Sequence, residues 1–218
     1  MKIERFVVNP FQENTYIVSD ETKQGVIIDC GAFYTEERKA IMDYIKENDI
    51  TIKHLIATHA HIDHCFGNNT IYDELGVKPE VFKDDEYLMA KLEKQALDFC
   101  NYHLGYDMPP VGKYLDETDV IEFGTHRFSV IPTPGHTPGS VFFYCEEENI
   151  AFSGDTLFKM SIGRTDFEKG SYKDIMNSLQ KLKECLPPDT IVLPGHGPKT
   201  TIGQEISSNP YMTSGTNN

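Results

Sequence analysis

Four short apolar runs of this chain end in the same way, in a tight turn that carries a histidine or an aspartate. HLIAT precedes His59, FSVIP precedes TPG and His136, NIAF precedes SG and Asp155, and TIVL precedes PG and His196. Short apolar runs bounded by glycine, proline or threonine predict buried strands. If these strands lie in one layered fold, their ends can converge at one edge, where loops held by a rigid sheet commonly form sites.

The first of these turns is the densest cluster of metal-binding side chains. THAHIDH, residues 58–64, contains His59, His61, Asp63 and His64. Imidazole nitrogen and carboxylate oxygen are good ligands for zinc and related divalent ions. His59 and His61 are two positions apart, so in extended backbone they point the same way and can hold one ion. Asp63 and His64 open the next predicted helix and can face a second ion.

The four turns supply seven ligand candidates, which are too many for one tetrahedral ion. They are His59, His61, Asp63, His64, His136, Asp155 and His196. Asp155 is the natural bridging carboxylate, because only Asp63 offers another. We expect two divalent ions, with zinc as the first choice and iron or manganese as alternatives. A bound ion lowers the pKa of water to about 7, so a hydroxide that bridges both ions can attack a carbonyl carbon.

Composition narrows the class of partner. The 218 residues carry 20 basic and 34 acidic side chains, a net charge of −14 with histidine neutral, which repels phosphate backbones and anionic lipid. The sequence shows neither a secretory signal nor an apolar stretch that could span a bilayer. Five widely spaced cysteines without a CxxC pair are typical of a reduced intracellular protein. We expect a cytoplasmic protein that binds neither nucleic acid nor membrane. Two divalent ions would outweigh the two candidate carboxylates and one hydroxide, so we still expect an anionic small molecule as the substrate.

Strand-like runs alternate with helical periodicities, which predicts an α+β domain with sheet inside and helices outside. The expected helices are 35–48 with Thr35 as N-cap, 64–76, 84–104 and 171–186. The expected strands are 2–8, 14–20, 25–30, 54–58, 80–83, 119–124, 126–133, 140–147, 149–155 and 190–194, and 158–170 is expected to be a loop. The length favours one domain over residues 1–212, followed by a polar tail at 213–218.

At this point the chain resembles the metallo-β-lactamase superfamily, and within it the glyoxalase II-like hydrolases. The motifs that carry the resemblance are THAHIDH, PTPGHTPGS, FSGDTLF, SIGRTDF and LPGHGP, with NPFQENTYIV and IIDCG near the start. They cover roughly residues 3–212. The resemblance implies a four-layer αββα sandwich with the metals at one edge of its two sheets.

The resemblance also assigns roles to the ligand candidates. It implies that His59, His61 and His136 bind the first ion, that Asp63, His64 and His196 bind the second, and that Asp155 bridges them. Asp63 and Asp155 are then expected to orient the metal-bound hydroxide. Asp29, in the sequence Asp-Cys-Gly, is expected to contact a ligand histidine from behind.

For activity, the resemblance implies hydrolysis of small acyl thioesters of the S-lactoylglutathione type. Glyoxalase II proper continues into a C-terminal helical domain that contacts glutathione, whereas this chain ends soon after His196 and resembles short bacterial-type forms. Arg164 matches a basic residue of the family, but Gly197-Pro198 replaces its tyrosine. Arg164 is therefore a candidate for binding a substrate carboxylate, and pairing with Asp166 is the equal alternative.

Other interpretations stay open at this stage. Persulfide dioxygenases of the same superfamily share His-x-His-x-Asp-His and GRTDF, and use one iron held by two histidines and one aspartate. A metal-stabilised binding module would need closed coordination, which seven ligands do not predict. The lack of an export signal disfavours a β-lactamase, and the charge disfavours a nuclease. Cys65 is either a small buried thiol or a group near the site, and helix 84–104, with Tyr102 and Tyr106, either packs as a solvated helix or covers the site.

Overall fold

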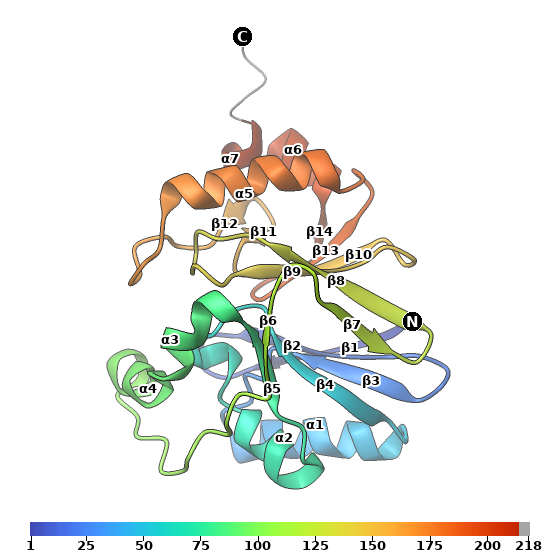
Figure 1. Ribbon diagram of the computed structural model, residues 1–218, viewed down its shortest axis with the longest axis vertical. Coiled ribbons are helices and arrows are strands. Elements are labelled where there is room, and N and C mark those ends of the chain that lie inside the picture. The colour runs from blue at the N-terminus through green and yellow to red at the C-terminus, as the bar shows by residue number, and fades with distance from the viewer. Residues whose placement is uncertain (214–218) are drawn as a thin grey trace.

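The computed structural model describes residues 1–213, which form two facing β-sheets with helices on both outer faces (Figure 1). The first sheet is covered by α1 (Thr35–Glu47) and α2 (Asn68–Leu75). The second is covered by α5 (Tyr172–Cys185), α6 (Ile202–Ser208) and α7 (Pro210–Thr213). The expected four-layer αββα sandwich is confirmed. The expected tail at 213–218 lies outside the described residues, apart from Thr213.

The first sheet follows chain order from β1 to β6. Its strands are β1 (Lys2–Val8), β2 (Glu13–Ser19), β3 (Gln24–Ile28), β4 (Thr51–Ala57), β5 (Pro79–Phe82) and β6 (Lys113–Leu115). The first three strands pair antiparallel, whereas β3 to β6 run parallel. The turn that follows β4 therefore lies at the carboxyl edge of the parallel part.

The second sheet has the order β14-β13-β10-β9-β8-β7. Its strands are β7 (Val120–Phe123), β8 (His126–Pro132), β9 (Val141–Cys145), β10 (Ile150–Gly154), β13 (Ile191–Pro194) and β14 (Thr200–Thr201). β10 and β13 are parallel neighbours, so the residues that follow them share one edge. β9 is antiparallel to both β8 and β10, so β8 ends at that same edge.

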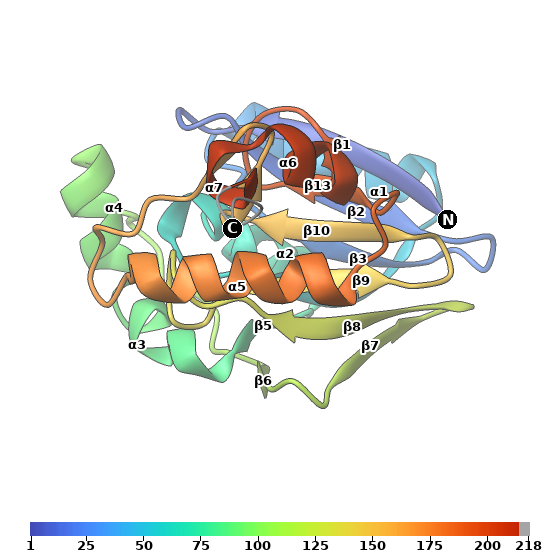
Figure 2. The same ribbon diagram turned by 90° about the horizontal axis from the view of Figure 1, so that it is seen from above.

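Side chains along β9 point alternately to the two faces of the second sheet and so contribute to two hydrophobic cores. Phe143 points between the sheets, where it packs with residues such as Ile56 and Phe152. Its neighbour Phe142 points outward and packs against Leu179 of α5. Figure 2 looks down on α5, which runs along the outer face of the second sheet beside β10. This period of two is what a sheet buried on both faces requires.

The helix expected over 84–104 is wrong. A 3₁₀ turn (Lys83–Asp85), α3 (Glu86–Met89) and α4 (Leu92–Cys100) replace it. Gln95 explains the break, because its side-chain amide is buried and donates to the carbonyls of Leu88 and Ala60, at 3.0 and 3.2 Å. The bond to Leu88 occupies a carbonyl that a continuous helix would pair with the N–H of Leu92, and the bond to Ala60 ties α4 to the turn after β4. Asn101 then ends α4 in a left-handed conformation with φ of 50°.

Smaller differences concern element ends and short strands. The helix expected over 64–76 begins at Asn68, because residues 62–64 form a separate 3₁₀ turn. Thr35 is the first residue of α1 and Tyr34 is its N-cap, so the expected cap is wrong by one position. The sequence did not predict β6, β14, α6, α7 and the hairpin of β11 (Leu157–Phe158) and β12 (Ser161–Ile162) inside the expected loop. None of the helices within residues 1–213 combines the length and apolar character needed to cross a bilayer.

Candidate metal centre

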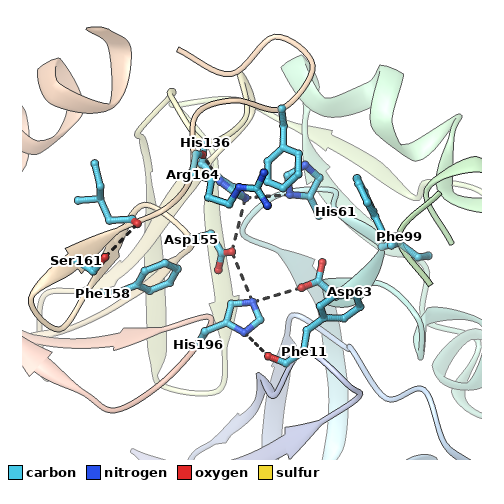
Figure 3. Close-up of a pocket in the computed structure, with 13 residues that line it drawn as sticks. Phe11, His61, Asp63, Phe99, His136, Asp155, Phe158, Ser161, Arg164 and His196 are labelled. Carbon is cyan, nitrogen blue, oxygen red and sulfur yellow. Dashed lines mark hydrogen bonds and ion pairs between the residues drawn. The ribbon is translucent and has the colours of Figure 1, made fainter. Parts of the chain in front are cut away.

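The structure brings all seven ligand candidates together at the edge where β4, β8, β10 and β13 end (Figure 3). In the first group, His59 Nε2 lies 3.1 Å from His61 Nδ1, which lies 2.9 Å from His136 Nε2. Ligand nitrogens around one tetrahedral zinc ion are about 3.4 Å apart, so small shifts allow the three to share an ion. Burial and the neighbouring histidines hold the pKa of His59 well below its usual range and lower that of His61 to about 3. Both rings are therefore neutral and can offer nitrogen lone pairs.

The second group contains Asp63, His64 and His196. His196 Nε2 lies 3.3 Å from Asp63 Oδ2, and His64 Nε2 lies 3.7 Å from the same oxygen. Burial alone would raise the pKa of the Asp63 carboxyl, but His64 and His196 outweigh it and lower this pKa. The Asp63 carboxylate is therefore ionised and available to an ion.

Asp155 stands between the two groups. Its Oδ1 lies 3.5 Å from His64 Nε2, and its Oδ2 lies 3.6 Å from both His136 Nε2 and His196 Nε2. Figure 3 shows the carboxylate between His136 and His196, with Asp63 to the right and in contact with the same His196 nitrogen. Asp155 therefore contacts a histidine of the first group and two of the second.

The outer ring nitrogens of several histidines are occupied by groups behind the site. His136 Nδ1 donates to the carbonyl of Arg164 at 2.7 Å, and His196 Nδ1 donates to the carbonyl of Phe11 at 3.0 Å. His64 Nδ1 lies 3.1 Å from Asp29 Oδ2. Such contacts fix the tautomer and the orientation of the ring, and leave Nε2 free to face a metal ion.

Asp29, expected behind a ligand histidine, contacts His64 and also the turn that carries the first group. Its carboxylate accepts hydrogen bonds from the backbone N–H and the hydroxyl of Thr58, both at 2.7 Å. Asp29 has a φ of 55°, a left-handed conformation that is uncommon outside glycine, asparagine and aspartate. One buried carboxylate thus links β3, the end of β4 and His64.

Close packing around the ligands explains one glycine. A Cβ on Gly195 would lie 2.4 Å from Asp155 Oδ1 and 2.7 Å from His64 Cε1. No real side chain can approach so closely, so only glycine allows the turn before His196 to lie against these two side chains.

The segment 9–16 holds the second group from behind, a role that the sequence did not predict. Asn9 Nδ2 donates to the carbonyl of Asp63 at 2.8 Å, and Asn14 donates from its backbone to Gly195 at 2.7 Å. Glu13 forms an isolated β-bridge with His196, and its fully buried carboxyl lies 3.9 Å from His64 Nδ1. The motif NPFQENTY carried the resemblance, but single polar residues beside a strand gave no local signal of these contacts.

Asp85 is a second residue whose role the sequence did not predict, and it contacts the two turns that carry the first ligand group. Its buried carboxylate accepts hydrogen bonds from the N–H of Ala60 at 2.9 Å, the hydroxyl of Thr137 at 2.8 Å and the N–H of Gly139 at 2.8 Å. Ala60 lies between His59 and His61, and Thr137 follows His136, so one side chain joins both turns of the group. Asp85 lies in an acidic stretch, KDDE, which reads as a solvated helix start from sequence alone.

A cavity of about 620 Å³ opens onto the centre. Ligand candidates of both groups line it, and its other walls are mostly aromatic: Phe11, Phe99, Phe158 and Phe167. Arg164 also lines it, but its guanidinium forms a two-point ion pair with Asp166, at 2.9 and 2.8 Å. Of the two alternatives for Arg164, the structure shows the internal pair.

The remaining candidates lie apart from the cavity. Cys65 is fully buried, and burial raises the pKa of its thiol well above the usual value, which favours the small buried thiol. Tyr106 donates from its hydroxyl to the carbonyl of Phe66, and the Tyr102 ring packs edge-on against Phe33. Neither tyrosine lines the cavity, although Phe99 of α4 does.

The chemistry of the centre fits divalent metal ions. His64 Nε2 and Asp155 Oδ1 are buried and have no hydrogen-bond partner among residues 1–213. Buried polar atoms without a partner cost free energy unless an ion or water satisfies them. Imidazole nitrogens and carboxylate oxygens are suitable donors for zinc, iron and manganese alike.

Comparison with known proteins agrees with this chemistry. The family model of the metallo-beta-lactamase superfamily matches residues 8–196, and the chain therefore belongs to that superfamily of metallohydrolases. The predicted resemblance is confirmed. Over 217 residues the chain is 35% identical to the hydroxyacylglutathione hydrolase GloC of Haemophilus influenzae, an alignment that covers 98% of this chain and 99% of GloC.

Solved structures show the same architecture. The chain is similar to the BLEG-1 B3 metallo-beta-lactamase, with 32% identity, a TM-score of 0.88 and coverage of 98% of this chain and 100% of that one. It is also similar to TTHA1623 in a di-iron-bound form, with 32% identity, a TM-score of 0.83 and coverage of 95% and 99%. ETHE1 from Myxococcus xanthus is more distant, with 26% identity, a TM-score of 0.76 and coverage of 96% and 84%. The fold, the histidine and aspartate cluster and these relatives define a metal-binding hydrolase.

Proposed function

We propose that this chain hydrolyses small acyl thioesters, of the S-lactoylglutathione type, with two divalent ions at the centre. The observation that carries the proposal is the place of Asp155, within 3.6 Å of histidines from both groups. A carboxylate shared by two ions is the arrangement that a two-metal hydrolytic site needs. The similarity to GloC supports the thioester as the substrate class. Zinc is the first choice of metal, with iron and manganese as alternatives.

The seven ligand candidates would bind the two ions as two groups that share one carboxylate. His59, His61 and His136 would hold one ion, and Asp63, His64 and His196 the other, with Asp155 between them. When bound, such ions act as Lewis acids and lower the pKa of water.

The Asp63 and Asp155 carboxylates face the space between the groups and would orient the attacking water by accepting its hydrogen bonds. The hydrogen bonds to the outer nitrogens of His136 and His196 would keep these ligands rigid during the reaction. The leaving thiol has a pKa of about 8.5, so it can depart as a thiolate without a general acid from the chain.

The substrate is proposed to be an anionic small molecule, because two divalent ions outweigh the two carboxylates of the centre. The cytoplasm is the proposed compartment, because widely spaced cysteines without a CxxC pair are typical of reduced proteins.

The test combines a metal count with turnover of a thioester panel. Protein reloaded with zinc should bind two ions per chain and hydrolyse S-lactoylglutathione, and exhaustive chelation should remove both properties. His59→Ala should abolish turnover, whereas His103→Ala should retain it, because His103 is exposed and within residues 1–213 pairs only with Glu93. Full activity after chelation, or in His59→Ala, would refute the proposal. A lactam belongs in the panel because of the similarity to BLEG-1.

The alternative is a persulfide dioxygenase with a single iron. Because those enzymes share the motif His-x-His-x-Asp-His, the second ligand group does not separate the two functions. The 35% identity to GloC, against 26% to ETHE1, favours the hydrolase. One iron per chain, together with oxygen uptake on a persulfide, would instead establish the dioxygenase.

A further inference from the structure

We infer that the site is built for a thioester that carries a flat apolar group on the side of the first ligand group, and that Phe99 and Phe167 select this group. We call these two residues the aromatic wall. The inference rests on the proposed thioester hydrolysis and adds the chemistry of one substituent. The group can belong to the acyl part or to the thiol part, and the experiment below separates the two.

The aromatic wall stands directly beside the first ligand group. The Phe167 ring centroid lies 4.9 Å from that of His61 and 5.6 Å from that of His136. The Phe99 ring lies 5.7 Å from Phe167 and 6.5 Å from His61, and Figure 3 shows it beside His61. A substituent next to a carbonyl held at the centre would therefore meet aromatic rings on this side.

The ring of Phe99 is available for such a contact. The residue is 47% exposed although it lines the cavity, so its apolar surface faces solvent at the mouth. Exposed aromatic surface in a concave site is the surface that an apolar ligand group covers with most gain.

Phe99 and Phe167 come from distant parts of the chain, and contacts outside the cavity hold the two segments together. Lys91, at the start of α4, forms an ion pair with Glu168 at 2.7 Å. Tyr87 donates from its hydroxyl to the carbonyl of Glu168 at 3.0 Å, and the ammonium of Lys169 lies 3.8 Å from the centre of the Tyr87 ring. Because these contacts hold α3 and α4 against the segment that carries Phe167, the wall is formed before a ligand binds, which lowers the ordering cost of binding.

The charged residues around the cavity also favour an apolar substituent. Apart from the histidines of the centre, Arg164 is the only basic side chain among the described residues that line it. Its guanidinium is paired with Asp166 and lies 4.5 Å from the centre of the Phe167 ring, so it also backs the aromatic wall. The two carboxylates of a glutathione moiety would therefore find no unpaired basic side chain among the described residues that line the cavity. Apolar contacts would then determine the selectivity for the substrate.

The acyl arm of the test compares S-lactoylglutathione with S-mandeloylglutathione, which differ only by a methyl and a phenyl group on the hydroxyacyl carbon. The thiol arm compares the lactoyl thioesters of ethanethiol and 2-phenylethanethiol. In one of the two arms we expect kcat/KM of zinc-loaded enzyme to be about tenfold higher for the phenyl compound, the scale of discrimination in apolar pockets. The arm that shows the preference identifies the part of the substrate that faces the aromatic wall.

Two variants assign the preference to the aromatic wall. Phe99→Ala and Phe167→Ala should each bring the ratio of the two kcat/KM values close to one. Tyr102→Ala is the matched control, because it removes a ring of similar exposure beside α4 that does not line the cavity. Equal rates in both arms, or a preference that survives in both wall variants, would overturn the inference.

A binding measurement keeps this inference separate from the proposed function. S-benzylglutathione and S-methylglutathione are thioethers that cannot be hydrolysed, and their affinities can be compared by calorimetry on the metal-loaded protein. Binding of the benzyl compound about tenfold more tightly, with the difference lost in Phe99→Ala, supports the aromatic wall even if no thioester is turned over. Equal affinities exclude the acyl part, and equal affinities together with equal rates in the thiol arm contradict the inference even if hydrolysis is observed.

Discussion

Replacing Asn9 by glycine removes the side-chain hydrogen bonds that hold the peptide of Asp63 and the neighbouring backbone of Gly31 and Phe11. The buried Asn9 amide donates to the carbonyls of Gly31 and Asp63, at 3.0 and 2.8 Å, and its backbone has a φ of 54°. Glycine accepts this left-handed conformation, so the change removes the side-chain bonds without adding strain. Two carbonyls lose their donor and the N–H of Phe11 loses its acceptor, Asn9 Oδ1 at 2.9 Å. At about 1–3 kcal/mol for each buried group, we expect a loss of about 3 kcal/mol or more in the free energy of unfolding.

Asn101→Gly is the matched control for this change. Asn101 has a similar φ of 50°, but it is exposed at the end of α4 and its side chain makes no hydrogen bond within residues 1–213. Its replacement should change stability by less than about 0.5 kcal/mol, apart from the backbone entropy of glycine that both variants share. Urea unfolding of the metal-free proteins, followed by circular dichroism, measures the difference without a contribution from metal binding.

The same variant should also weaken the second ligand group. Because the peptide of Asp63 loses its support, we expect Asn9→Gly to bind the second equivalent of zinc less tightly than the parent protein does. Asn101→Gly should bind both equivalents as tightly as the parent. Asn9→Gly would refute the reasoning if its unfolding free energy and its zinc stoichiometry both matched those of Asn101→Gly.

Two further predictions concern backbone packing and pH. Gly135→Ala places a Cβ 2.3 Å from the backbone nitrogen of Ile175, whereas Gly76→Ala meets open space. Both glycines have a positive φ, 145° and 71°, but only the first change should lose zinc bound by the first ligand group in a metal count. Burial alone would raise the pKa of Asp20, but hydrogen bonds from neighbouring residues, including Thr125, outweigh it and hold this pKa below the usual range. A carboxylate of this kind stabilises the fold above its unfolded pKa of about 3.9, and the contribution is lost as the pH falls through the folded value. Asp20→Asn should therefore cost about 2 kcal/mol at pH 7 in urea unfolding, with a smaller difference from the parent below pH 4; an equal difference at pH 3 would count against it.

The parts of the fold that were predictable have strong local signals. Apolar runs such as HLIAT and TIVL are bounded by turn residues, and the ligand candidates directly follow them, so strand ends and candidates were found together. The break in helix 84–104 depends instead on the side chain of Gln95 bonding to Leu88 and Ala60, which periodicity does not reveal. β6 and β14 have three and two residues and exist through pairing with longer neighbours, so their own sequences contain little signal.

The supporting residues of the site were hidden for a related reason. Glu13 and Asp85 are fully buried, yet a single acidic residue in a polar stretch is usually solvated, and nothing in the local sequence marks these two as exceptions. Their roles depend on contacts with Ala60, Thr137 and His196, which are distant in the sequence. Such contacts become visible only once the two sheets face each other.

The ligand candidates come from both sheets, with His59 following a strand of the first and His196 following a strand of the second. An ion bound by ligands from both sheets would link the two sheets of the sandwich. Unfolding of either sheet would therefore release the ion. During synthesis, a nascent chain cannot complete the cluster until His196 has left the ribosome, long after the first histidines have emerged. Metal loading would then be a late event that reports a finished fold.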